Sequence, residues 1–155
     1  MIYFLITGLA AGIDLFIKAG IDRMPDSSLP RDLKGTKGRV ELKKLRNPGF
    51  PLGTLSSFPR IVKAVPLFMT SLILGRLSLL LPRKGHIAEK TGLALTAGGS
   101  LSNVYDRFFR SSVVDYIHVK KGFLSHIIFN LGDLFIAAGG VWLVVAGLLK
   151  KEETQ

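Results

Sequence analysis

Four apolar stretches, each close to the length that crosses a lipid bilayer, constrain the fold of this chain more than any other feature. They cover residues 2–21, 61–81, 87–104 and 129–149, and the charged residues collect between them. A helix needs about 20 apolar residues to span the hydrocarbon layer. With 155 residues and a mean hydropathy of +0.37, the sequence predicts an all-α membrane protein with four transmembrane helices. We expect a single membrane domain over residues 1–155.

Composition excludes several classes of site and partner. The chain has no cysteine, so it can form neither a disulfide nor a thiolate nucleophile nor a zinc–thiolate site. Its three histidines, His86, His118 and His126, lack the spacing of metal ligands, and no metal is expected. The net charge of +10 would suit nucleic-acid binding in a soluble protein. In a membrane protein, anionic lipids are the expected counterion, and no nucleic-acid partner is expected.

The first apolar stretch is expected to remain as a transmembrane helix. Its start, residues 1–4, carries no basic residue and so differs from the start of a cleaved signal peptide. Asp14 and Lys18 lie four positions apart in it. On a helix they would share one face and could neutralise each other, which predicts a structural ion pair.

Two loops are expected at one end of the bundle, over residues 22–60 and 105–128. In the first, residues 40–45 predict a strand, followed by a turn at Asn47-Pro48-Gly49. We therefore expect a small β-containing platform between the first and second helices. The third apolar stretch, residues 87–104, is rich in Gly, Ala and Ser, which favours a position at the centre of the bundle.

Asp115 and Asp133 are the strongest candidates for chemistry. A carboxylate in or beside hydrocarbon is costly, so it usually pairs, lines a wet cavity or reacts. An even number of spans puts both termini on one side, so the loops after the first and third spans share the other side. The two aspartates are then expected at the same rim. Two carboxylates that meet can share one proton and divide the acid and base roles.

Each candidate also has a purely structural interpretation. Asp133 could be the N-cap of the last helix, and Asp115 could be a solvated loop carboxylate. Asn47 could be explained by its turn alone, and Arg107 could be an interfacial cation that extends to the headgroups. The sequence by itself leaves these alternatives open.

Five short motifs resemble those of signal peptidase II, the bacterial prolipoprotein signal peptidase, a membrane aspartyl endopeptidase with four spans. They occur in the family's order and cover essentially the whole chain. The motifs are Asp14–Lys18, Asn47–Gly53, Gly98–Arg107, Val113–Ile117 and Phe129–Asp133.

The resemblance implies a role for each matched residue. It makes Asp115 and Asp133 the catalytic pair, which activates a water molecule. The matched polar residues around the active site are Asn47, Gly49, Asn103, Arg107 and Asn130. The matched supporting charges are Asp14, Lys18 and Asp106. No metal or organic cofactor is implied.

The resemblance also implies a reaction and a location. The expected reaction is cleavage of a lipid-modified prolipoprotein before its diacylglyceryl-cysteine. The expected partners are this substrate and membrane lipids, and the expected state is a monomer. The expected location is the bacterial cytoplasmic membrane, with the active site near its extracytoplasmic face.

Several positions differ from the family's usual pattern. The family usually has Gly where this chain has Ser102, Ala where it has Gly132 and Ser where it has Leu134. It also usually has three small residues at positions 50–52. These differences motivate an alternative, a catalytically altered paralogue that acts as a membrane lipid-binding or assembly factor. An ion or proton carrier is a second alternative, because membrane carboxylates also mark transporters. The chain lacks the inverted repeats typical of that class.

The distribution of basic residues gives two conflicting expectations for orientation. Residues 22–60 hold nine Lys or Arg against four Asp or Glu, so the positive-inside rule favours a cytoplasmic loop. The family resemblance places the same loop outside. Basic residues also mark the opposite end of the bundle, at Arg76, Arg83, Lys84, Lys90, Lys150 and Lys151. The basic loop could instead bind lipid phosphates.

Overall fold

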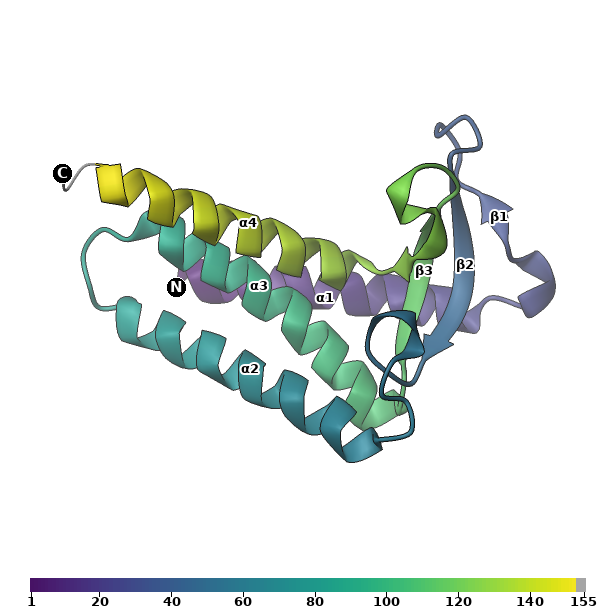
Figure 1. Cartoon of the computed structure of the whole chain (residues 1–155), viewed down its shortest axis with the longest axis horizontal. Coiled ribbons are helices and arrows are strands. Elements are labelled where there is room, and N and C mark those ends of the chain that lie inside the picture. The colour runs from purple at the N-terminus through teal and green to yellow at the C-terminus, as the bar shows by residue number, and fades with distance from the viewer. Residues whose placement is uncertain (153–155) are drawn as a thin grey trace.

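Four long helices and a small sheet make up the computed structural model, which describes residues 1–152. The helices are α1 (Ile2–Arg23), α2 (Pro59–Leu80), α3 (Ile87–Tyr105) and α4 (Leu131–Glu152). The sheet lies at one end of the helix bundle (Figure 1). The start of α1 and the end of α4 both lie at the other end, as expected for an even number of spans (Figure 1).

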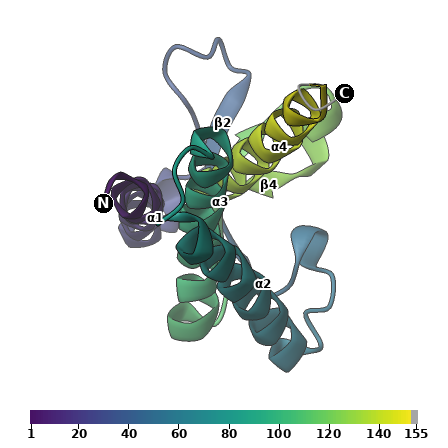
Figure 2. The same cartoon turned by 90° about the vertical axis from the view of Figure 1, so that its left-hand side faces the viewer.

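Three of the four helices have the length and composition of membrane spans. These are α1, α2 and the Leu131–Leu148 part of α4. Helix α3 is less apolar and lies among the other three (Figure 2). The prediction of four spans is therefore supported for three helices, and the predicted central position of the third stretch is confirmed.

Glycines let α3 approach its neighbours closely. A Cβ atom added at Gly98 would lie 2.6 Å from the Cβ of Ala10 on α1. One added at Gly139 of α4 would overlap the Thr96 hydroxyl, whereas one added at Gly140 would meet nothing within 4 Å. Small residues thus bring the backbones of α3 and α4 together, as expected where lipid gives apolar side chains little reason to associate.

The sheet is built from both loops, which corrects the predicted platform. Its antiparallel strands are β1 (Arg31–Asp32), β2 (Val40–Asn47), β3 (Val113–Val119) and β4 (Ile128–Phe129), in the order β1-β2-β3-β4. The strand expected at residues 40–45 is confirmed and extends to Asn47. The second loop, for which no strand was predicted, supplies β3 and β4. Strand β3 forms by pairing with β2, which lies far away in the sequence, so the local pattern around β3 does not reveal its partner.

Strand β3 separates two environments. Val114 and Tyr116 are buried against Ile21 of α1. Val113 and Asp115, on the alternate positions, line a cavity on the other face. This division follows from the two-residue period of a strand.

Two helix ends differ from the predicted boundaries because of local structure. Helix α3 continues into a π-helical turn, η3 (Asp106–Arg110), which ends at Ser111 with a φ of 60°. Helix α4 begins at Leu131 rather than at Phe129, because Phe129 belongs to β4. Three short 3₁₀ turns complete the fold: η1 (Asp26–Ser28), η2 (Pro51–Gly53) and η4 (Phe123–His126).

Candidate active site

Asp115 and Asp133 line one cavity of about 320 Å³ at the sheet end of the bundle. Asp115 comes from β3, and Asp133 comes from the first turn of α4. Asp115 is 4% exposed and lies in a strand, so its interpretation as a solvated loop carboxylate is wrong. Three other candidate residues also line the cavity: Asn47, Asn103 and Arg107.

Asn130 links the two aspartates. Its Nδ2 donates to Asp115 Oδ1 at 2.7 Å, and its Oδ1 accepts a hydrogen bond from the Asp133 backbone N–H at 2.9 Å. Asp133 Oδ2 in turn accepts from the Asn130 N–H at 3.1 Å. This is a reciprocal cap, in which Asn130 rather than Asp133 is the N-cap of α4. Because a backbone N–H can only donate, the orientation of the Asn130 amide is fixed.

Asn103 presents its amide nitrogen to Asp133 for a similar reason. The Lys18 ammonium donates to Asn103 Oδ1 at 2.7 Å. Asn103 Nδ2 therefore faces Asp133 Oδ1, to which it donates at 2.8 Å.

Asn47 closes its own turn and also contacts Asp115. Its Oδ1 accepts from the Gly49 N–H at 3.0 Å, which closes the turn before Pro48-Gly49. Its Nδ2 then donates to Asp115 Oδ2 at 3.2 Å. Gly49 has no room for a side chain, because a Cβ atom there would lie 2.8 Å from Gly53 O.

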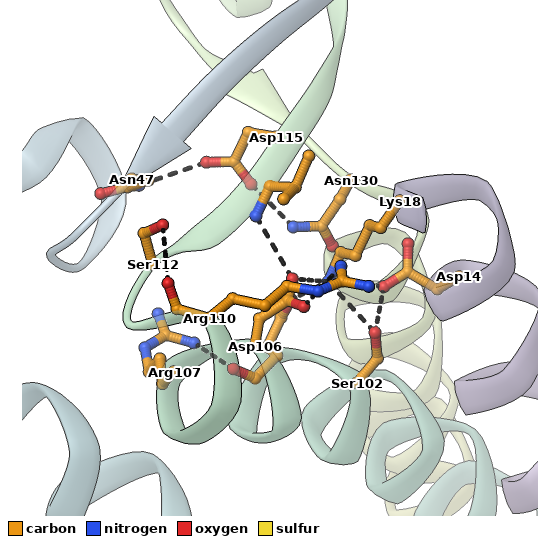
Figure 3. Close-up of polar contacts among 12 residues, drawn as sticks. Asp14, Lys18, Asn47, Ser102, Asp106, Arg107, Arg110, Ser112, Asp115 and Asn130 are labelled. Atoms are coloured by element: carbon orange, nitrogen blue, oxygen red, sulfur yellow. Dashed lines mark hydrogen bonds and ion pairs between the residues drawn. The ribbon is translucent and has the colours of Figure 1, made fainter. Parts of the chain in front are cut away.

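A buried cluster of charges supports this site from within the bundle (Figure 3). The Lys18 ammonium lies 2.8 Å from Asp14 Oδ2 and 3.1 Å from Asp106 Oδ2, and all three side chains are fully buried. Ser102 accepts a hydrogen bond from Lys18 at 3.1 Å and donates to Asp14 Oδ2 at 2.5 Å. The predicted Asp14–Lys18 pair is therefore present. Pairing and hydrogen bonding compensate for removing these charges from water.

Tyr116 connects the charge cluster to the start of α4, although it was not among the predicted site residues. Its hydroxyl donates to Asp14 Oδ1 at 3.0 Å and accepts from the Leu131 N–H at 3.1 Å. The β-branched and aromatic residues on both sides of Asp115 are typical of a strand and could have indicated this role. A strand places Tyr116 on the face opposite Asp115. Asp106 Oδ2 accepts from the Val114 N–H at 3.2 Å on that same strand.

Arg107 is turned inward instead of extending to the membrane surface. Its guanidinium is buried and donates to Asn103 O at 3.1 Å and Gly49 O at 3.3 Å. Burial lowers the pKa of Arg107, and the nearby Asp133 carboxylate opposes that shift. Its Nε has no hydrogen-bond partner among the described residues. Arg107 also lines the cavity that holds Asp115 and Asp133.

The electrostatics of the cavity favour protonation of Asp115. Burial first, and then the charge of Asp133, raise the pKa of Asp115 to about 6. The hydrogen bonds from Asn130 and Asn47 oppose the shift. The pKa of one of the two neighbouring carboxyl groups in this poorly solvated cavity is thus raised toward neutral pH, as acid–base chemistry requires.

The chain matches a known family over most of its length. The sequence profile of signal peptidase (SPase) II matches residues 6–149. This chain belongs to the signal peptidase II family. The lipoprotein signal peptidase of Syntrophus aciditrophicus is 31% identical over 159 residues, which cover 99% of this chain and 96% of that protein.

Other members of the signal peptidase II family match over shorter regions. The lipoprotein signal peptidase of Rickettsia felis is 34% identical over 98 residues, 63% of this chain and 50% of that protein. In such matches the chain spans about half the length of the curated relative. A solved bacterial membrane enzyme, determined by the in meso method at 2.3 Å resolution, has a TM-score of 0.80 at 22% identity. That similarity covers 99% of this chain and 91% of the other, and concerns the fold.

Within residues 1–152, no group of three or more His, Cys, Asp or Glu side chains is placed to hold a metal ion. The polar atoms around Asp115 and Asp133 are amide and guanidinium donors, which suit a carboxylate pair better than a cation.

Proposed function

We propose that this chain is an aspartyl endopeptidase that removes the signal peptide from lipid-modified prolipoproteins, cutting before the diacylglyceryl-cysteine. The observation that carries the proposal is the Asn130 side chain, which links Asp115 to the Asp133 backbone at the wall of one cavity. Membership of the signal peptidase II family supports the same substrate class. The proposed site lies in the bacterial cytoplasmic membrane, near the extracytoplasmic face.

In the proposed reaction, Asp133 is the ionised base. Each of the two carboxylates accepts two N–H hydrogen bonds, which for Asp133 come from Asn103 and from the Asn130 backbone. Asp133 differs from Asp115 in lying in the first turn of α4, where the helix dipole favours negative charge. Asp133 removes a proton from water, and that water attacks the scissile carbonyl carbon.

Asp115 is the proposed acid. Its raised pKa lets it hold a proton that it donates to the carbonyl oxygen as the tetrahedral diol forms. When the diol collapses, a proton moves to the leaving amine and the peptide bond breaks. Arg107, which lines the same cavity, would position a substrate carbonyl beside the pair. No covalent intermediate forms.

The differences from the family pattern leave these groups in place. Ser102 and Gly132, two of the differing positions, meet at the carboxylate of Asp14. Ser102 donates to Asp14 Oδ2, and a Cβ atom added at Gly132 would lie 2.7 Å from the same oxygen. Relative to the family pattern, this chain has an additional hydroxyl group at Ser102 and lacks a methyl group at Gly132, so the two changes compensate in volume. This compensation supports an intact site over a catalytically altered paralogue.

A cleavage assay with paired substrates tests the proposal. The purified protein in detergent is incubated with a prolipoprotein peptide carrying diacylglyceryl-cysteine, and with the same peptide unmodified. Mass spectrometry should show a product that begins at the modified cysteine, and no cleavage of the unmodified peptide. In ¹⁸O-labelled water, one labelled oxygen should enter the new carboxyl group of the released signal peptide. Absence of cleavage of the modified peptide would contradict the proposal.

A further inference from the structure

The first loop carries more positive charge than its own carboxylates can neutralise. Every acidic residue in it already contacts a cation. These contacts include Asp22–Arg46 at 2.5 Å, Asp26–Lys44 at 2.6 Å, Asp32–Lys120 at 2.5 Å and Glu41–Lys43 at 2.9 Å. Hydrogen bonds with Lys43, His118 and Lys120 lower the pKa of Glu41 to about 2, so this carboxylate stays ionised and is already paired.

Three of the loop's cations without a carboxylate partner lie together at one end of the sheet. Lys34, Lys37 and Arg39 are exposed in the turn between β1 and β2, and within residues 1–152 none of them has a carboxylate within 4 Å. The Lys120 N–H donates to Arg39 O at 2.8 Å, which brings the β3–β4 connection beside this turn. That connection adds Lys121, which is also exposed and has no described carboxylate partner.

Exposed apolar side chains lie next to these cations. Phe123 is 88% exposed and Leu124 is 41% exposed, both in the η4 turn that follows Lys121. The turn is held in place, because a ring nitrogen of His118 lies 2.9 Å from Ser125 O. Leu33, at the start of the β1–β2 turn, is exposed as well. We call the surface formed by Lys34, Lys37, Arg39, Lys121 and Phe123 the basic rim.

The basic rim extends sideways from the bundle at the level where α4 begins. The β1–β2 turn and η4 project on the side of the molecule away from α2 (Figures 1 and 2). Residues 128–130 connect η4 directly to α4, a helix with the length and composition of a membrane span. A membrane around α4 would therefore have its headgroup layer beside the basic rim.

We propose that the basic rim binds the phosphate-bearing headgroups of anionic phospholipids, with Phe123 and Leu124 inserted among the acyl chains. Exposed aromatic and aliphatic residues next to lysines are typical of interfacial membrane contacts. Each cation near an anionic surface strengthens binding. An acidic protein would explain the charge but not the exposed apolar residues beside a membrane span. Lipid binding also explains why a loop expected outside is so basic.

Lipid enrichment at the basic rim can be measured without any substrate. The chain has no cysteine, so Leu124→Cys provides a single labelling site for a fluorophore. The labelled protein is placed in nanodiscs that contain equal amounts of phosphatidylglycerol and phosphatidylcholine. A nitroxide on the acyl chain of one lipid or of the other quenches the fluorophore when that lipid is close. The ratio of the two quenching efficiencies reports which lipid is enriched.

We expect quenching by the phosphatidylglycerol nitroxide to exceed quenching by the phosphatidylcholine nitroxide. Lys34→Gln/Arg39→Gln should lower this preference by at least about five-fold, since each cation contributes on the order of a five-fold change in local anionic lipid. Salt of about 1 M should also lower it, because the Debye length is then about 3 Å. Arg83→Gln/Lys84→Gln removes two exposed cations at the opposite end of the bundle and should leave the preference unchanged.

Three results would overturn the proposal. Equal quenching by the two lipids in the labelled wild-type background would show that no headgroup is selected. An unchanged preference for phosphatidylglycerol in Lys34→Gln/Arg39→Gln would show that other residues select the lipid. An equal loss in the Arg83→Gln/Lys84→Gln control would assign it to net charge instead of the basic rim.

Discussion

The Lys18 ammonium and the Asn103 side-chain oxygen lie 2.7 Å apart in the interior of the bundle, and this contact orients a group in the candidate active site. An ammonium can only donate, so the Asn103 oxygen must face it. The Asn103 amide nitrogen then has to face Asp133, to which it donates at 2.8 Å. A buried charge deep in the bundle thereby fixes a hydrogen-bond donor at the cavity.

Replacing either aspartate by asparagine should remove activity and leave the fold nearly intact. Asparagine keeps the shape of the side chain but can neither take the proton of water nor hold one to donate. We expect Asp115→Asn and Asp133→Asn each to lower the cleavage rate by at least about 10²-fold, the lower end for loss of an acid or base. Cleavage of a lipidated peptide and thermal unfolding, both in detergent, measure the two effects. Asp26→Asn, an exposed carboxylate paired with Lys44, is the matched control and should keep full activity.

The stability of the protein should depend on pH through Asp115. Its ordinary pKa near 3.8 is raised to about 6 in the folded protein, chiefly by burial. Between these values the unfolded carboxyl ionises freely and the folded one does not. The folded state should therefore lose roughly 3 kcal/mol as pH rises from about 4 to above 6. Unfolding free energies of the wild type and Asp115→Asn should diverge over that range. If the difference between the two unfolding free energies does not vary with pH, the pKa of Asp115 is not raised in the folded protein.

Lys18→Met should destabilise the protein more than Asp14→Asn does. Methionine at position 18 would leave Asp14 buried without a cation and Asp106 with only its contact to Arg110, whereas Asp14→Asn leaves Lys18 its contact with Asp106. Loss of one partner from a buried pair costs about 3–5 kcal/mol, and we expect Lys18→Met to reach this range. Chemical unfolding in detergent gives both values. Equal losses would mean that Asp106 does not share the charge of Lys18.

The approach of α3 and α4 can be tested at two adjacent glycines. Gly139→Ala would place a methyl group against the Thr96 hydroxyl, and we expect a loss of about 1–3 kcal/mol from overpacking. Gly140→Ala meets nothing within 4 Å and should be neutral or stabilise the helix by up to about 1 kcal/mol. Thermal unfolding of the two variants compares the same substitution one position apart. A similar effect at both positions would argue against close packing of these helices.

The match between Ser102 and Gly132 should appear in a double-mutant cycle. Gly132→Ala alone brings a methyl group against the Asp14 carboxylate, which Ser102 also contacts, and should destabilise the protein. Ser102→Gly removes the hydroxyl on the other side and lets that carboxylate move. We therefore expect the double variant to recover about 0.5–3 kcal/mol relative to additivity. Strictly additive effects would show that the two positions are independent.

The sequence was sufficient to place the two aspartates near each other. Segregation of apolar and charged residues predicts the helices, and counting them puts Asp115 and Asp133 at one rim. The turn at Asn47-Pro48-Gly49 was also visible, since its residues act locally. These features depend on composition and on spacing along the chain.

Contacts between distant segments could not be read in the same way. Nothing local indicates that Asp106 would be the second partner of Lys18, because that contact depends on how α1 packs against the end of α3. The Tyr116 bond to Asp14 likewise requires the position of β3 relative to α1. The strand β3 was itself missed, because its pairing partner β2 lies in a distant part of the chain.

The length of the segment that carries Asp115 is constrained by the alternation of β3. One face of the strand borders the cavity, and the other holds Tyr116 against Asp14. Deleting one residue between Ser111 and Asp115 would shift the register and exchange the two faces. Asp115 would then point into the helix bundle, and Tyr116 would point at the substrate. Members of the family should therefore tolerate substitutions in this strand more readily than any change in its length.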